Sequence, residues 1–231
     1  MKISILLPYK ENFSPNYAGA VSLFVKDTVN NSKFKKQTYV YGNTDYKKKL
    51  LSNYINLSLN KSFYQSGSKL YVQSFLSHEQ KKNSEIIEVH NRPNYIKFLK
   101  DETSSKLALF FHNDPLSMNG SKSVKDRIYL LKNIDQLIFN SNWSKSRFFI
   151  GMKDVYVSPK KITVAYQSAP KTKVNLKKKE NLISFIGKLN KAKGYDLFGS
   201  AVVKILNKYP KWKAYVIGDE PREKLSFKHK N

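Results

Sequence analysis

The sequence contains no cysteine. This absence excludes a disulfide framework, a thiolate zinc site, an iron–sulfur cluster and a cysteine nucleophile. It also favours a reducing compartment, so we expect a cytoplasmic protein.

Long apolar runs are missing as well. Uninterrupted apolar stretches reach only the length of Leu107–Phe111, far below the roughly 18–20 residues that cross a bilayer. We therefore expect no membrane-spanning helix. The apolar segment 3–7 is too short for a signal peptide and is followed by no small-residue cleavage site, so it is predicted to be the first strand.

Acidic residues are few. Against 42 Lys+Arg there are 17 Asp+Glu, which gives a net charge of +25. Such a charge attracts polyanions and anionic lipid head groups, but it also fits a lysine-rich composition spread over a solvated surface. No helix-turn-helix, zinc finger or RNP-like motif accompanies the charge, so we expect no specific nucleic-acid partner. Nearly all the cations are lysine, the arginines being Arg92, Arg127, Arg147 and Arg222.

What the sequence does contain is core-forming material, with 40% hydrophobic and 13% aromatic residues. Short apolar strands without polar alternation are separated by helical stretches, which predicts an α/β fold with a doubly wound parallel sheet. Strands are expected at 3–7, 37–41, 85–90, 106–111, 136–139 and 161–165, and helices near 21–29, 93–99, 124–132 and 143–149. Between 43 and 82 the pattern indicates only a helix near the end of the segment.

The composition of the sequence changes after Pro170. We interpret 1–170 as a complete Rossmann-like N-terminal domain and the polar, basic stretch 171–180 as a linker. The segment 181–231 then gives one βαβ unit, with strands at 182–186 and 212–217 around a helix at 195–208. Too few residues follow for a doubly wound domain, so we expect the second unit to be partial.

Ligands bind parallel sheets beyond the carboxyl ends of the strands. Gly19 lies between the first strand and helix, where it either admits a ligand or makes an ordinary turn. His90 with Asn91, and His112 with Asn113, follow two further strands. A histidine there serves as a proton-transfer group or as a structural anchor. No third ligand stands at a recognisable spacing, so no metal is expected.

A fourth strand end carries Gly187, Lys188 and Lys193 in a turn immediately before a helix. Two ammonium groups beside helix N-terminal amides suit a diphosphate, although either lysine could equally be solvated. The turn is neither a Walker A loop nor a G-x-G-x-x-G motif.

The run Gly-Lys-Leu-Asn-x-x-Lys-Gly from Gly187, followed by a helix and the strand ending at Gly218, resembles the family 4 glycosyltransferases of GT-B architecture. Gly19, the segment from His112 to Pro115, the Phe139–Lys145 segment and the strand from Lys161 agree with that family in order. The resemblance covers essentially the whole chain.

The resemblance implies transfer of a hexosyl group, with retention, from a nucleotide-diphosphate sugar without a metal or other cofactor. It assigns the diphosphate to Gly19, Gly187, Lys188 and Lys193, and places His112 as the catalytic residue facing the acceptor and reacting sugar. His90, Asn91 and Asn113 are expected on the acceptor side. The implied acceptor is an envelope glycan, as in lipopolysaccharide synthesis, or a lipid-linked molecule at an anionic membrane surface.

Two departures from the family qualify this expectation. Lys188 stands where the family usually has arginine, and lysine lacks the planar bidentate fork. The family's Glu-x7-Glu motif, which holds the donor, falls beyond the last residue, so we expect a fragment with impaired activity. The alternative is a non-catalytic basic Rossmann protein that binds nucleotides or nucleic acid.

Overall fold

The computed structural model describes residues 1–59, 66–153, 155–169, 171, 173, 175 and 179–218. The chain divides into two compact units, Met1–Pro170 (unit 1) and Lys171–Asn231 (unit 2). Residues 172, 174 and 176–178 of the expected linker, and 219–231 of the expected βαβ segment, lie outside the described residues.

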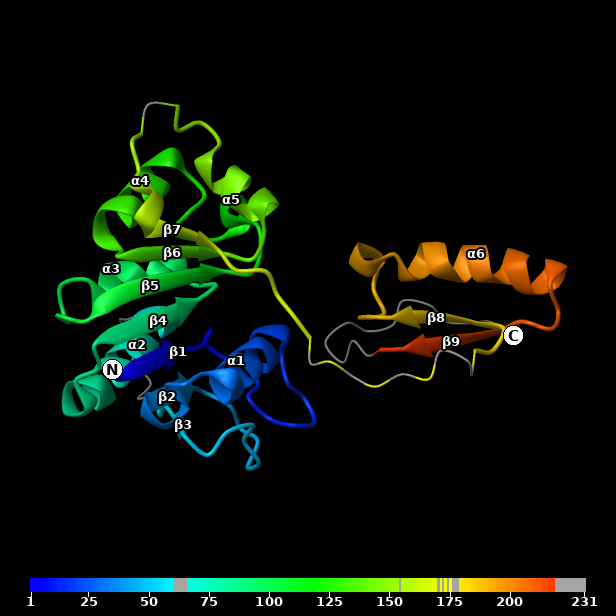
Figure 1. Cartoon of the computed structure of the whole chain (residues 1–231), viewed down its shortest axis with the longest axis horizontal. Coiled ribbons are helices and arrows are strands. Elements are labelled where there is room, and N and C mark those ends of the chain that lie inside the picture. The colour runs from blue at the N-terminus through cyan, green and yellow to red at the C-terminus, as the bar shows by residue number, and fades with distance from the viewer. Residues whose placement is uncertain are drawn as a thin grey trace. The chain divides into compact units, whose positions relative to one another are not determined.

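Unit 1 is built on a parallel sheet, which with its flanking helices confirms the predicted α/β class (Figure 1). Its described residues form seven strands in the order β3-β2-β1-β4-β5-β6-β7. The carboxyl ends of β1, β4, β5 and β6 therefore lie along one sheet edge. The strands are β1 (Ile3–Leu6), β2 (Thr38–Gly42), β3 (Tyr54–Asn56), β4 (Ile86–His90), β5 (Lys106–Phe111), β6 (Gln136–Phe139) and β7 (Ile162–Val164).

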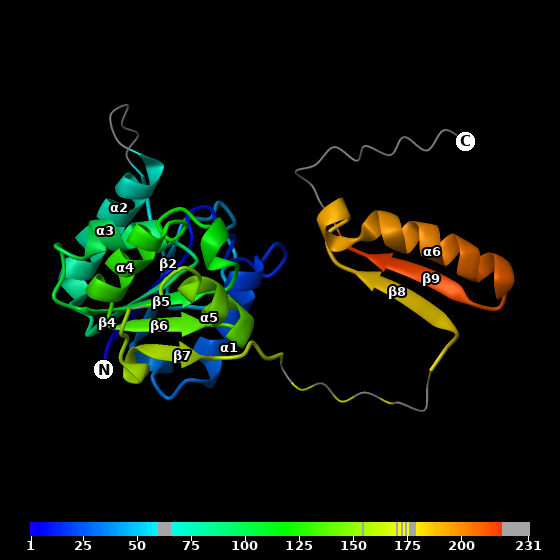
Figure 2. The same cartoon turned by 90° about the horizontal axis from the view of Figure 1, so that it is seen from above.

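Successive strand residues point to opposite sides of the sheet, so both of its faces carry apolar side chains. Helices cover both faces. Leu6 of β1 packs in the larger core cluster, whereas Ile5 and Leu7 pack in the smaller one. The smaller cluster contains the apolar side of α1 (Ala20–Asn31), and the larger cluster contains those of the other helices. These are α2 (Gly67–Lys82), α3 (Ile96–Leu99), α4 (Val124–Asn133) and α5 (Asn142–Phe149). Figure 2 shows α2, α3 and α4 grouped on one side of the strands.

Serine caps fix where three of these helices begin. Ser66 accepts from the Lys69 amide, and Ser123 forms a reciprocal capping box with Asp126 at the start of α4. Ser141 does the same with Ser144 at α5. The loops that leave the carboxyl ends of the strands are therefore anchored where they enter the next helix.

Unit 2 contains β8 (Leu182–Ile186) and β9 (Lys213–Ile217), which pair in parallel and are connected by α6 (Tyr195–Lys208). Phe185 of β8 packs on Tyr195 and Phe198 of α6, with ring centroids 5.4 Å apart in both pairs. Leu197 of α6 is 73% exposed, because the described part of unit 2 offers α6 only two strands to pack against.

None of the helices in the described part of the chain combines the length and apolar character that crossing a bilayer requires.

Candidate functional site

Two histidines meet at the carboxyl edge of the unit 1 sheet. His90 ends β4 and His112 follows β5, and these neighbouring parallel strands bring His90 Nδ1 to 2.8 Å from His112 Nε2. His90 is fully buried, whereas His112 is half-buried. The sheet thus joins two of the residues that the sequence identified separately.

A carboxylate and an amide extend this pair at its two ends. Glu88, two residues before His90 on the same strand face, places Oε1 2.8 Å from His90 Nε2. Gln167, in the segment after β7, places its amide nitrogen 2.7 Å from His112 Nδ1. We call Glu88, His90, His112 and Gln167 the imidazole chain.

The imidazole chain defines where the protons lie when both rings are neutral. A bare ring nitrogen 2.8 Å from a carboxylate oxygen would set two lone pairs against each other, so His90 Nε2 carries the hydrogen. Within the described residues, no aligned hydrogen bond is found at His90 Nε2, so its N–H bond does not point straight at the Glu88 carboxylate. The contact between the two side chains is therefore mainly electrostatic. His90 Nδ1 then accepts from His112 Nε2, which leaves His112 Nδ1 to accept from Gln167.

Aromatic rings enclose His112. Phe110 stacks on it with centroids 4.5 Å apart, and Phe24 of α1 meets it edge-on at 4.9 Å. Burial lowers the pKa of His112 to about 3, and the neighbouring His90 adds to the effect. His112 is therefore a neutral hydrogen-bonding group at physiological pH and not a cation.

Asn91 fixes the backbone on which His112 stands. It adopts a left-handed conformation, with φ of 52°, and is almost fully buried. Its Oδ1 accepts from the amides of His112 at 2.8 Å and Asn113 at 3.3 Å. Asn140 Nδ2, after β6, donates to the His112 carbonyl at 2.8 Å. The Asn91 side chain thus positions the backbone that follows β5. The side chain of Asn113 is exposed.

An ion pair anchors the loop beyond His112. Arg147 of α5 donates to Asp114 from Nη2 at 2.9 Å and from Nε at 3.2 Å. These hydrogen bonds hold the pKa of Asp114 below its ordinary value. The loop therefore keeps its course at any pH near neutrality.

Gly19 lies at the start of α1, where a carboxylate fills the space beside it. An added Cβ would stand 1.9 Å from Glu11 Oε1. The same oxygen accepts from the amide of Ser22 at 3.2 Å and from its hydroxyl at 3.3 Å. The free amides at this helix start thus face an internal anion in this structure.

Gly187, Lys188 and Lys193 lie together in the β8–α6 loop of unit 2. Asn190 Oδ1 accepts from the Lys193 amide at 3.2 Å and closes the turn. The side chains of Lys188 and Lys193 are exposed at the start of α6. The loop and the start of α6 thus carry two lysines and helix N-terminal amides, which are chemistry suited to phosphate oxygens.

Sequence reasoning missed Glu88, Gln167 and Glu11. A signal existed for Glu88, because an acidic residue two positions before His90 in a buried strand must share its face. Nothing local marks Gln167 or Glu11, since their partners depend on tertiary packing.

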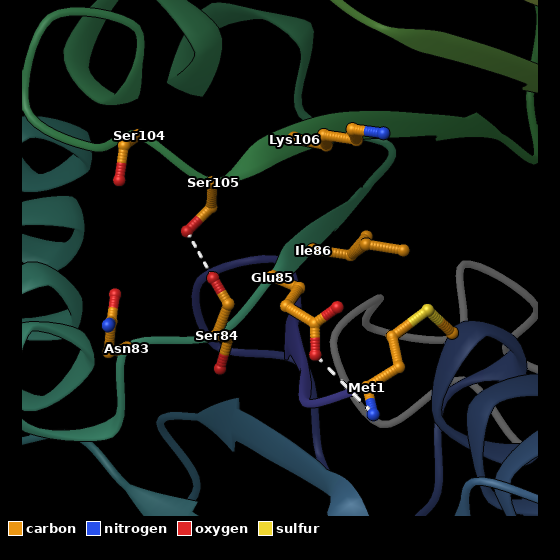
Figure 3. A pocket seen from close by; sticks show the side chains of 8 residues that line it. All are labelled: Met1, Asn83, Ser84, Glu85, Ile86, Ser104, Ser105 and Lys106. Atoms are coloured by element: carbon orange, nitrogen blue, oxygen red, sulfur yellow. Dashed lines mark hydrogen bonds and ion pairs between the residues drawn. The ribbon is translucent and has the colours of Figure 1, made fainter.

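A cavity of about 400 Å³ lies at the opposite sheet edge, among residues that precede or begin β1, β4 and β5 (Figure 3). Its groups pair with one another: the Met1 amino group lies 3.4 Å from Glu85, and the Ser105 hydroxyl donates to the Ser84 carbonyl at 2.6 Å. These contacts connect strand beginnings and are structural.

Comparison with solved structures identifies the architecture. HepE from Anabaena, crystallised with UDP, superposes with a TM-score of 0.65 at 14% identity, over 95% of this chain and 61% of HepE. The chain has the GT-B fold. Sucrose-phosphate synthase from Thermosynechococcus elongatus gives a TM-score of 0.63 at 12% identity, over 97% of this chain and 64% of the synthase.

A glycosyltransferase from Rickettsia africae shares the GT-B fold with a TM-score of 0.57 at 11% identity, over 94% of this chain and 68% of its own. No protein-family model matches the sequence, and no curated protein matches it significantly. The chain spans about three fifths of the length of HepE, of which it covers 61%.

Proposed function

We propose that this GT-B chain is part of a glycosyltransferase that moves a hexosyl group from a nucleotide-diphosphate sugar, with retention at the anomeric carbon. The observation that carries the proposal is the likeness of its fold to that of HepE, which was crystallised with UDP and with UDP-glucose. The lysine-bearing β8–α6 loop adds a group suited to the same class of ligand.

The chemistry would depend on stabilising the departing diphosphate. Negative charge grows on that leaving group as the glycosidic bond breaks, and fixed cations aimed at it lower the barrier. Lys188 and Lys193, with Gly187 allowing close approach, would supply this stabilisation. Gly19 is proposed as a further diphosphate contact, which requires the Glu11 side chain to turn away from the start of α1. We expect no metal, because two ammonium groups can balance the charge.

His112 would face the acceptor and the reacting sugar as a neutral group whose Nδ1 accepts a hydrogen bond from a sugar hydroxyl. His90, Asn91 and Asn113 would form the acceptor side around it. We infer an envelope glycan or lipid-linked acceptor, with action in the cytoplasm and peripheral attachment to an anionic membrane. The net charge of +25 supports that attachment.

Calorimetric titration with UDP, UDP-glucose and GDP-mannose tests the donor site. We expect Lys188→Gln and Lys193→Gln each to weaken binding of the preferred nucleotide by roughly tenfold, the loss of one charge-assisted contact. Lys191→Gln is the matched control, because Lys191 is an exposed lysine of the same loop, and it should change affinity less than about twofold.

Equal losses in all three variants would contradict a built diphosphate site and indicate diffuse attraction to lysine. Binding to DNA that exceeds nucleotide binding and falls steeply with salt would instead favour the nucleic-acid alternative. Retention is tested separately, by the anomeric proton signal of the first product formed.

A further inference from the structure

A cavity of about 430 Å³ lies beside the imidazole chain, where the loops leaving β4 and β5 face the start of α2. Its volume is in the range of small-ligand pockets. The residues that line it include Arg92, Lys122, Asn94, Asn119, Ser68 and Ser117. We call this cavity the Arg92 pocket.

The lining of the Arg92 pocket contains two cations and no carboxylate. Four further cavities in the described part of the chain each include at least one acidic residue: Glu85, Asp101, Glu79 or Asp27. In the same described residues, neither Arg92 nor Lys122 is in an ion pair with this chain's acids. The positive charge in this pocket is therefore uncompensated at short range.

The Arg92 guanidinium and the backbone of Lys122 are also held in place. Arg92 Nη1 donates to the Asn91 carbonyl at 2.9 Å, and the guanidinium also hydrogen-bonds the Tyr95 hydroxyl, which leaves its remaining N–H donors for a ligand. The backbone carbonyl of Lys122 accepts from the buried Arg127 at 2.8 Å. Gly120 has φ of 92°, and a Cβ there would stand 2.6 Å from the Asn94 amide, so the two walls touch.

Continuity with the imidazole chain indicates what kind of ligand belongs here. Asn91 lines the Arg92 pocket, and its side-chain oxygen holds the amide of His112. A small molecule anchored in the pocket would therefore extend along the residues that position His112. Amide and hydroxyl groups from Asn94, Asn119, Ser68 and Ser117 complete a lining suited to a hydroxylated, anionic compound.

We propose that the Arg92 pocket is an anion subsite that takes a phosphate or carboxylate group of the acceptor sugar. The assignment of the ligand as acceptor rests on the proposed function. The guanidinium fork of Arg92 pairs with two oxygens of either group, and Lys122 supplies the second charge.

The test follows the arginine Nε–Hε signals of the full chain by NMR. The sequence has four arginines, so the spectrum is simple and Arg92→Gln assigns the signal. Probes are glucose 1-phosphate, glucuronate and, as the uncharged control, glucose. We expect a saturable shift of the Arg92 signal with at least one anionic probe and none with glucose, and the stronger probe identifies phosphate or carboxylate as the anion.

The affinity for the stronger anionic probe, measured by calorimetric titration because Arg92→Gln lacks the reporting signal, should fall at least tenfold in Arg92→Gln and severalfold in Lys122→Gln. Lys132→Gln, which removes an exposed lysine from the last turn of α4, should leave it unchanged. Lys122 is exposed, so its variant keeps the test valid if Arg92→Gln does not fold. An unmoved Arg92 signal, or equal affinity in Lys122→Gln and Lys132→Gln, would overturn the proposal.

UDP separates this proposal from the proposed function. We expect Lys193→Gln to weaken UDP binding without affecting the anionic sugar, and Lys122→Gln to do the reverse. If UDP does not bind while the Arg92 response persists, the donor assignment fails and the anion subsite stands. If both probes depend on Lys193 alone, the Arg92 pocket is refuted.

Discussion

Glu88 determines which nitrogen of His112 carries the hydrogen, although it contacts His112 only through His90. Its carboxylate requires a hydrogen on His90 Nε2, and the remaining His90 nitrogen requires one on His112 Nε2. His112 Nδ1 then has a lone pair that accepts a hydrogen bond, and in this structure the donor is the Gln167 amide. Gln167 is exposed, so a ligand hydroxyl can replace its amide without exposing a buried side chain to solvent.

Nitrogen-15 NMR of the imidazole rings tests this arrangement. We expect His112 to remain neutral with hydrogen on Nε2 from about pH 8 to about pH 4.5, far below the ordinary titration of histidine near 6.5. The reason is its pKa of about 3, which burial causes. In Glu88→Gln, the side chain offers either an oxygen or an amide hydrogen to His90, so a second His112 tautomer should appear.

The matched control for that variant is Glu85→Gln, which removes an exposed carboxylate just before the same strand. It should leave both ring signals of His112 in place. A protonated His112 at neutral pH would contradict the effect of burial on its pKa, and an unchanged single tautomer in Glu88→Gln would show that Glu88 does not govern the pair.

Among the elements of unit 2, the carboxyl ends of β8 and β9 meet in one close approach of their backbones. A Cβ on Gly218 would lie 1.7 Å from the Gly187 carbonyl oxygen, and that atom belongs to backbone that cannot turn aside. The Gly187 amide also donates to the Ile217 carbonyl at 3.0 Å, so the two strand ends are tied together. The lysine-bearing loop begins at this contact.

Gly218→Ala should therefore destabilise unit 2 by at least about 1–3 kcal/mol, the range for forced overpacking. Gly199→Ala is the matched control, because a Cβ there meets nothing within 4 Å in α6. It should stabilise unit 2 by about 0.5–1 kcal/mol. Denaturation followed by Trp212 fluorescence, in a Trp143→Phe background, reports on unit 2 alone, and an undiminished midpoint in Gly218→Ala would contradict the close approach.

The extent to which sequence predicts these elements depends on how local their causes are. Runs such as Leu107–Phe111 are apolar on both faces, which is sufficient to predict a central parallel strand. Tyr54–Asn56 is only three residues long and exposed in part, so no pattern reveals β3. The strand-end rule brought His90 and His112 to one edge, but the Arg92 pocket requires α2 and two loops to meet.

Stability is unevenly divided between the two units. Every side chain in the two buried core clusters belongs to unit 1. In unit 2, Ile186 is 76% exposed and Leu197 73% exposed. Since apolar burial is the dominant favourable contribution to folding, unit 1 contains most of what holds the described structure together.

Residues 1–169 should consequently fold as a separate polypeptide. We expect its amide NMR spectrum to superpose on the unit 1 signals of the full chain, with a thermal midpoint within a few degrees. The control is residues 1–133, which lacks Leu137, Phe139 and Phe148 and so leaves the larger cluster open; it should be unfolded. Loss of the native spectrum in 1–169, with the full chain folded, would mean that unit 2 supplies stability to unit 1.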